Sequence, residues 1–132
     1  MSDEQKVPAG ELAVGYEFPP VSYHLEPEVV AAYVTAVGAG DSLNGGLVPP
    51  TALAAYAMAI LLENMDMPSG TIHTHQQLEF KSAVVVGEII TCHAQVSRNQ
   101  SRGKFHFLNI DLDVLDKTQR SVLAGKANFI LP

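Results

Sequence analysis

The stretch that decides the fold is VPPTALAAYAMAILLENM, residues Val48–Met65. Alanine, leucine and methionine favour helix, and Pro50-Thr51 suits a helix start. The apolar run from Ala52 to Leu62 is not interrupted by a polar face, so we expect a helix that is buried on most sides. The run is shorter than the roughly 18–20 residues that a bilayer span needs. It therefore predicts the buried core helix of a soluble domain.

The composition indicates one folded domain over residues 1–132, because 47% of the residues are hydrophobic and only 17% are charged. The net charge of −6 argues against a nucleic-acid partner. A single cysteine excludes an intramolecular disulfide, which fits a cytoplasmic location. The polar residues 1–10 lack the apolar core of a signal peptide, and we expect them to form a flexible tail. No stretch predicts a membrane anchor.

The segments before the central helix are an extended arm, a short helix and a loop. Tyr16–Leu25 contains two prolines, which is typical of an edge strand or an extended arm. A first helix opens at Glu26-Pro27, and it carries an apolar stripe at helical spacing that includes Tyr33. Glycines end this helix, and Asp41–Leu47 forms the loop that leads to the central helix.

Almost everything after Gly70 has the pattern of β-strands. The four expected strands are Thr71–Lys81, Val86–Ser97, Lys104–Val114 and Ser121–Leu131. Turns are expected at Asn99–Gly103 and Asp116–Gln119. Apolar residues alternate with polar ones, which predicts one face toward a core. We therefore expect an α+β fold in which an antiparallel meander curls around one long buried helix.

This order of elements, with the residues it contains, resembles the hot-dog fold of MaoC-like acyl dehydratases and hydratases. The stretch EVVAAYVTAVGAGD (Glu28–Asp41) resembles the helix that leads to that family's catalytic loop. GLVPPTALAAYAM (Gly46–Met58) resembles the entry to its central helix. LEFKSAVVVGEIITCHAQV (Leu78–Val96) resembles its pair of strands with a phenylalanine and a turn glycine. The likeness extends from about Gly15 to the end of the chain.

The resemblance implies catalytic roles for Asp41 and Asn44. The family's active-site pattern is roughly D-x-N-P-x-H, and Asp41 matches its aspartate. Asn44 stands one place later than the family's asparagine. The proline and histidine that should follow are absent, because Gly45-Gly46 leads directly toward Pro49. Asp41 also suits a loop residue whose carboxylate satisfies nearby amides.

Hydration of an enoyl thioester needs hydrogen-bond donors at the thioester oxygen, where negative charge develops. The first amides of the central helix are such donors, because they lack partners within the helix. Prolines have no N–H, so the donors would be Thr51, Ala52 or Leu53. These three residues are the predicted substrate-binding group. Alternatively, the two prolines only start the helix and Thr51 caps it.

The histidines do not form a metal-binding pattern. His73 and His75 share a strand face at i, i+2 spacing, but a third ligand is missing nearby. An exposed polar strand face beside a subunit contact explains them better. His106 stands in an apolar row, where a hydrogen-bonded core histidine is expected. We expect neither a metal nor a cofactor.

Three functions remain open. The first is an (R)-specific enoyl-thioester hydratase or 3-hydroxyacyl dehydratase with Asp41 as the base. The second is a non-catalytic acyl-binding subunit of a hot-dog hetero-oligomer, and the third is a hot-dog thioesterase. The resemblance implies an acyl-CoA or acyl-carrier-protein thioester as ligand. It also implies a homodimer or higher oligomer, with a second hot-dog subunit as an alternative partner.

Overall fold

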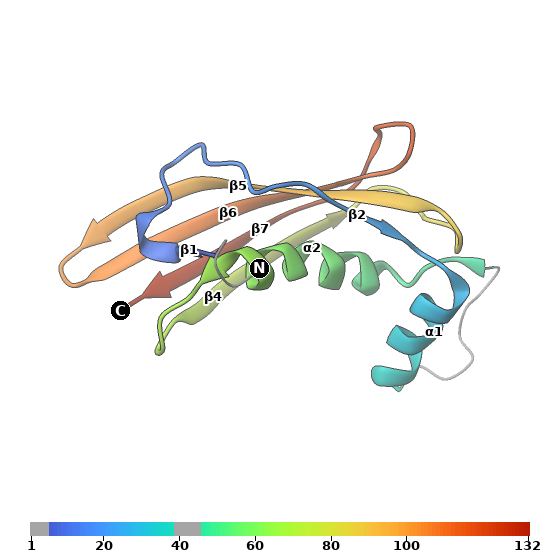
Figure 1. Ribbon diagram of the computed structural model, residues 1–132, viewed down its shortest axis with the longest axis horizontal. Coiled ribbons are helices and arrows are strands. Elements are labelled where there is room, and N and C mark those ends of the chain that lie inside the picture. The colour runs from blue at the N-terminus through green and yellow to red at the C-terminus, as the bar shows by residue number, and fades with distance from the viewer. Residues whose placement is uncertain (1–5, 39–45) are drawn as a thin grey trace.

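The computed structural model describes residues 6–38 and 46–132. Its sequence of elements is mixed, with helices in the first half and long strands in the second (Figure 1). The elements are β1 (Val7–Pro8), the 3₁₀ helix η2 (Ala9–Glu11), β2 (Val21–His24), α1 (Pro27–Ala36), α2 (Pro50–Asn64), β3 (Met65–Asp66), β4 (Ile72–Phe80), β5 (Ile89–Arg102), β6 (Phe105–Leu115) and β7 (Ser121–Leu131).

A five-stranded antiparallel sheet is the frame of the molecule, with the order β2-β5-β6-β7-β4. The predicted edge strand within Tyr16–Leu25 is confirmed as β2. The prediction of a four-strand meander is wrong for β4. This strand pairs with β7 at the far edge and not with β5, which follows it in the sequence. The connection from β4 to β5, residues 81–88, therefore has to cross the end of the sheet.

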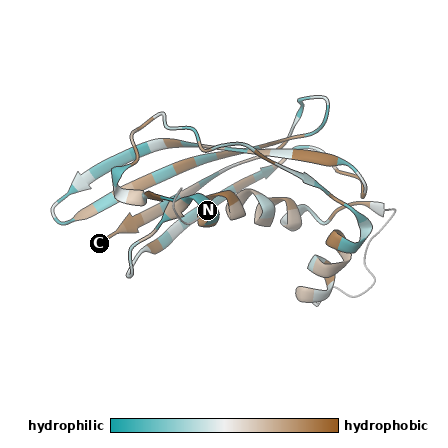
Figure 2. Ribbon diagram, viewed as in Figure 1, coloured by the Kyte–Doolittle hydropathy of each residue, from teal (hydrophilic) through white to brown (hydrophobic). Residues whose placement is uncertain are grey.

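The helix α2 lies along one face of the curved sheet (Figure 1). Its buried residues are Ala52, Leu53, Ala57, Ile60 and Leu61. They pack against the apolar rows of the central strands, which include Ile90, Cys92, Leu108, Ile110 and Leu123. Figure 2 shows these strands banded, with hydrophobic and hydrophilic residues alternating along them. The alternation predicted from the sequence is thus confirmed, and it places one face of the sheet against α2.

The prediction that α2 is enclosed on most sides is wrong for this single chain. The face of α2 that points away from the sheet is open, and Leu62 on that face is 64% exposed. One sheet covers about half of a helix surface, so an all-apolar helix needs a second covering layer. The open face of α2 is therefore an apolar surface on the outside of the chain.

The N-terminal segment is ordered further toward its start than the sequence suggested. Val7–Pro8 pairs in parallel with Met65–Asp66, directly after α2, and Ala9 is fully buried. The side chain of Asn99 donates hydrogen bonds to the carbonyl oxygens of Gly10 and Leu12, at 3.2 and 2.6 Å. Residues 7–10 are therefore not part of the expected flexible tail, because these contacts fix them on the fold.

The hairpin between β5 and β6 is longer and tighter than expected. The predicted turn at Asn99–Gly103 is wrong, because β5 continues to Arg102 and β6 starts at Phe105. Gly103 has a φ of 62°, which glycine adopts at little cost in a two-residue hairpin turn. His106 is half-buried near the hairpin end, and its Nδ1 lies 3.1 Å from the Ser101 hydroxyl.

Gly125 on β7 allows β4 to lie close to β7, because glycine has no side chain. A Cβ atom at residue 125 would stand 2.6 Å from the carbonyl oxygen of Gln77 on β4. We expect Gly125→Ala to lower the free energy of unfolding by about 1–3 kcal/mol, because the strands must separate. Gly10→Ala is the control, since its nearest atom would be 4.0 Å away. Equal urea midpoints for the two variants would contradict this prediction.

Candidate functional site

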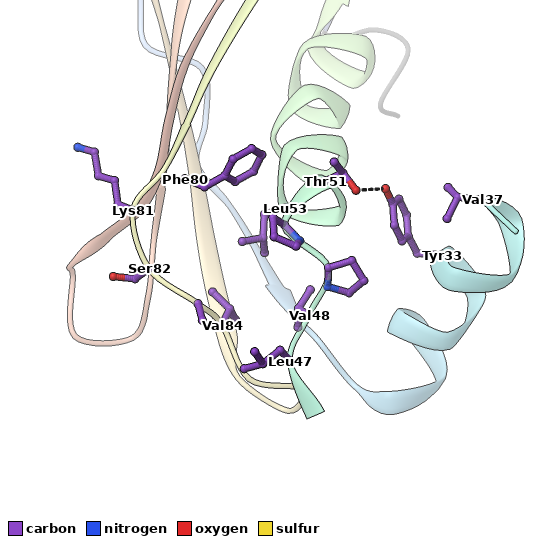
Figure 3. A pocket seen from close by; sticks show the side chains of 13 residues that line it. Tyr33, Val37, Leu47, Val48, Thr51, Leu53, Phe80, Lys81, Ser82 and Val84 are labelled. Atoms are coloured by element: carbon purple, nitrogen blue, oxygen red, sulfur yellow. Dashed lines mark hydrogen bonds between the residues drawn. The ribbon is translucent and has the colours of Figure 1, made fainter. Parts of the chain in front are cut away.

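A cavity of about 540 Å³ opens at the N-terminal end of α2 (Figure 3). Its walls come from three parts of the chain: α1, the segment that leads into α2, and the crossover that follows β4. The lining is mostly apolar and consists of Tyr33, Val37, Leu47, Val48, Pro49, Pro50, Thr51, Leu53, Phe80, Lys81, Ser82, Ala83 and Val84. This is the end of the helix at which the sequence placed a substrate.

The cavity is held in shape by backbone hydrogen bonds between the two segments that flank it. The amide of Val48 donates to the carbonyl oxygen of Val84 at 2.8 Å, and that of Val86 donates to Gly46 at 2.7 Å. The amide of Lys81 donates to the carbonyl oxygen of Val122 at 2.9 Å. The crossover is thus fixed to the sheet at one end and to the start of α2 at the other.

The start of α2 has the two prolines at the positions expected for a helix N-terminus. Pro49 is the N-cap residue, with ψ of 131°, and Pro50 begins the helix. The amide of Ala52 donates to the carbonyl oxygen of Pro49 at 2.9 Å, and Ala52 is fully buried and not part of the lining. The structure gives the Ala52 amide a partner within the chain, and the role of Ala52 in substrate binding stays a prediction.

Thr51 and Leu53 do line the cavity. Within residues 6–38 and 46–132, no backbone carbonyl accepts a hydrogen bond from the Thr51 amide. That amide lies in the first turn of α2, where N–H groups have no helical partner. Leu53 is almost fully buried and forms part of the apolar wall. Their roles in binding a ligand stay predictions.

A pair of hydroxyl groups is the polar feature of the cavity nearest to α2. The Tyr33 hydroxyl donates a hydrogen bond to Thr51 Oγ1 at 2.7 Å, which joins α1 to α2. Figure 3 shows Lys81 and Ser82 extending away from the helix, whereas Tyr33 and Thr51 face each other. Sequence reasoning placed Tyr33 only on the apolar stripe of α1. The signal that it missed is the hydroxyl itself, because phenylalanine would satisfy a purely apolar stripe equally well.

Two further tyrosines, Tyr56 and Tyr23, lie near Tyr33 and α2. Tyr56 on α2 stacks on Tyr23 of β2, with ring centroids 5.0 Å apart. Burial raises the pKa of Tyr56, and the nearby Tyr33 raises it further. Burial is also the main cause of the raised pKa of Tyr23, followed by the charge of Glu63. Both phenols are therefore neutral at physiological pH.

Among the described residues, His73 and His75, which the sequence singled out, are not part of the cavity lining. Asp41 and Asn44 lie outside the described residues. His73 stacks on Phe129 with 4.7 Å between ring centroids, and the pairing of β4 with β7 shifts between His73 and His75. Among the residues that the structure describes, no three histidine, cysteine or acidic side chains form a group that could hold a metal ion.

The order of the elements agrees with what comparison with known proteins finds. Residues 12–124 match the family model described as the dehydratase domain region of FAS1-like proteins. The chain belongs to this family. The predicted membership of the MaoC-like hot-dog group is thereby confirmed, as is the α+β hot-dog fold. No curated protein matches the sequence.

Solved structures with the same fold cover nearly the whole chain. An (R)-hydratase from A. caviae, described as involved in PHA biosynthesis, has a TM-score of 0.75 and 21% identity over 92% of this chain and 98% of its own. The R-hydratase PhaJ1 from Pseudomonas aeruginosa has a TM-score of 0.76 and 16% identity, over 96% and 86%. The HadBC complex from Mycobacterium tuberculosis, a 3R-hydroxyacyl-ACP dehydratase, has a TM-score of 0.68 and 14% identity, over 89% and 96%.

The part of the chain that the structure describes contains no helix long and apolar enough to cross a membrane.

Phe80 provides a test of the cavity as a binding site. It lines the cavity and is 45% exposed, whereas Phe105, at the far hairpin, is 43% exposed and not part of the lining. We expect Phe80→Asp to weaken binding of octanoyl-CoA at least about tenfold, because a carboxylate in the apolar wall must lose water when an acyl chain binds. Isothermal titration calorimetry measures the affinity. Equal weakening by Phe105→Asp would show that the ligand binds elsewhere.

Proposed function

We propose that this protein is an acyl-thioester hydratase or dehydratase that acts on an enoyl-CoA or 3-hydroxyacyl thioester. The observation that carries the proposal is the apolar cavity at the start of α2, which is large enough for an acyl chain. Thr51 lines this cavity, and its amide donates to no backbone carbonyl within residues 6–38 and 46–132. Hydratase and dehydratase descriptions of the family and of the structural relatives support it. Fold alone does not fix function, so the proposal depends on this site.

The reaction defines what the site has to supply. In hydration, a base removes one proton from water while the hydroxyl oxygen bonds to Cβ of the enoyl group. The electron pair of the double bond moves toward the thioester, and Cα then takes up a proton. Before Cα is protonated, negative charge develops on the thioester oxygen, and hydrogen-bond donors stabilise this charge. Dehydration is the reverse of the same steps.

Within this proposal, Asp41 is the general base and Asn44 helps to orient the water. The backbone amide of Thr51 donates to the thioester oxygen, at the positive end of the α2 dipole. Leu53 and the apolar lining hold the acyl chain. In the sequence, Asp41 stands between α1 and α2, and residues of both helices line the cavity.

Loss of the carboxylate tests the catalytic role of Asp41. We expect the parent protein to hydrate crotonyl-CoA, and Asp41→Asn to lower kcat by about 100-fold or more, because the water loses its base. The decay of the conjugated enoyl absorbance measures the rate. Asp66→Asn is the control, since Asp66 is exposed on β3 and away from the lining. Release of free thiol instead of hydration would indicate a thioesterase.

A second candidate is a non-catalytic acyl-binding subunit of a hot-dog hetero-oligomer. The sequence favours it at one point: Gly45-Gly46 follows Asn44 where the resembled pattern continues with proline and histidine. HadBC, which has the same fold, is described as a 3R-hydroxyacyl-ACP dehydratase complex. The result that would favour this candidate is a parent protein that binds octanoyl-CoA but neither hydrates crotonyl-CoA nor releases thiol from it.

We infer that the protein assembles through β4 and the open face of α2. β4 is a nine-residue strand at the sheet edge, and most of its residues are exposed. An edge of this length is a template for pairing with another strand. The open face of α2 needs a covering layer for a different reason, because its exposed side chains, such as Leu62, are apolar. A second copy, or a second hot-dog subunit, would satisfy both surfaces at once.

A charge on the open face of α2 tests this assembly. Leu62 on α2 is 64% exposed and Val14, in the N-terminal segment, is 63% exposed. We expect the parent to have a mass at least twice its 14.1 kDa, and Leu62→Glu to shift it to the monomer, because a buried carboxylate opposes association. Light scattering after gel filtration measures the mass. A monomeric parent, or equal effects of Leu62→Glu and Val14→Glu, would contradict the inference.

A further inference from the structure

We propose that the hydroxyl of Thr51 is a second hydrogen-bond donor to the thioester oxygen and that Tyr33 is the residue that positions it. The inference rests on the proposed function, because it assigns a role in the same cavity. It concerns side chains, whereas the donor considered so far is the Thr51 backbone amide. Thr51 would then contribute two donors to one oxygen atom.

The direction of the observed hydrogen bond supports this role. A threonine hydroxyl has one proton to donate and two lone pairs that accept. Thr51 Oγ1 accepts the proton of the Tyr33 hydroxyl at 2.7 Å, so one lone pair is used and the proton of Thr51 itself is kept for another acceptor. Both residues line the cavity, where a ligand oxygen can be that acceptor (Figure 3).

Tyr33 also fixes the rotation of the Thr51 side chain. Thr51 is exposed in the first turn of α2, where its side chain is free to change rotamer in the absence of a partner. Tyr33 is half-buried in α1 and packs against the core, so its hydroxyl is held in place by the helix that carries it. A donor that is already oriented costs no reorganisation when charge develops on the substrate.

The electrostatics of the pair strengthen the Thr51 donor. A hydroxyl that accepts a hydrogen bond becomes a better donor, because hydrogen bonds in a chain polarise one another. The order Tyr33 to Thr51 to thioester oxygen is such a chain. It ends at the positive end of α2, which favours the developing negative charge.

A set of matched variants separates this role from a purely structural link between α1 and α2. Tyr33→Phe and Thr51→Val each remove one hydroxyl with little change of shape, and Thr51→Ser keeps the hydroxyl. Tyr16→Phe is the control, because Tyr16 is a half-buried tyrosine that packs edge-on against Phe18, 5.1 Å between centroids, outside the cavity. Thermal unfolding of all variants shows which of them are folded.

We expect Thr51→Val to lower kcat for crotonyl-CoA by about tenfold to a hundredfold and Tyr33→Phe by at least about fivefold, with KM changed less than kcat. The double variant should be no slower than Thr51→Val, since Tyr33 acts through Thr51. Thr51→Ser should retain more of the parent kcat than Thr51→Val, because it keeps the hydroxyl. Tyr16→Phe, outside the cavity lining, should keep the parent kcat. Additive losses, or a Tyr33→Phe variant with the parent kcat, would overturn the proposal.

A second measurement does not require turnover. Cinnamoyl-CoA is a conjugated enoyl thioester whose absorption moves to longer wavelength when hydrogen bonds polarise its carbonyl group. We expect this red shift with the parent and with Thr51→Ser, a smaller shift with Tyr33→Phe and a smaller one again with Thr51→Val.

The two measurements distinguish the two claims. A red shift that depends on both hydroxyls in a protein without hydratase activity would support the donor pair and contradict the proposed reaction. Hydration of crotonyl-CoA that is unaffected by the variants would support the reaction and overturn the donor pair. Absence of both hydration and red shift in the parent would contradict both.

Discussion

The packing of one face of α2 against the sheet is the interaction on which the rest of the molecule depends. Leu53, Ile60 and Leu61 are almost fully buried there, and each side chain of this size contributes about 1.5–3 kcal/mol when it leaves water. Without that face the sheet would expose its apolar rows. The helix therefore covers the apolar rows of the sheet, and its first turn lies where the chain forms the cavity.

The cavity follows from the strand order. Because β4 pairs with β7 at the far edge, the chain must cross the end of the sheet to reach β5, and residues 81–88 make this crossing beside the start of α2. The crossing segment hydrogen-bonds to the residues that lead into the helix, through Val48 and Val84. The first turn of α2, the apolar lining and the hydrogen bond between Val48 and Val84 thus lie together at this end of the sheet. The site is a consequence of the topology rather than of a separate insertion.

Local patterns in the sequence predicted the elements well, whereas contacts between distant segments could not be derived from them. The helix at Val48–Met65 follows from residue propensities and an unbroken apolar run, and the edge strand before Leu25 follows from its two prolines. The long strands follow from alternating polarity. The place of β4 in the sheet was missed, because periodicity gives the face of a strand but not its neighbour. The role of Ala9 was missed because a short apolar residue in a polar segment gives no signal of burial. Tyr33 was placed on the correct helix, but its contact with Thr51 depends on how α1 and α2 approach each other.

A crystal structure of the protein with bound butyryl-CoA, a saturated thioester that cannot be hydrated, tests the central claim most directly. The account predicts that the butyryl chain lies between Leu53 and Phe80 and that the thioester oxygen accepts hydrogen bonds from the amide and the hydroxyl of Thr51. An acyl group bound outside this cavity, or a thioester oxygen beyond hydrogen-bond distance of Thr51, would contradict it.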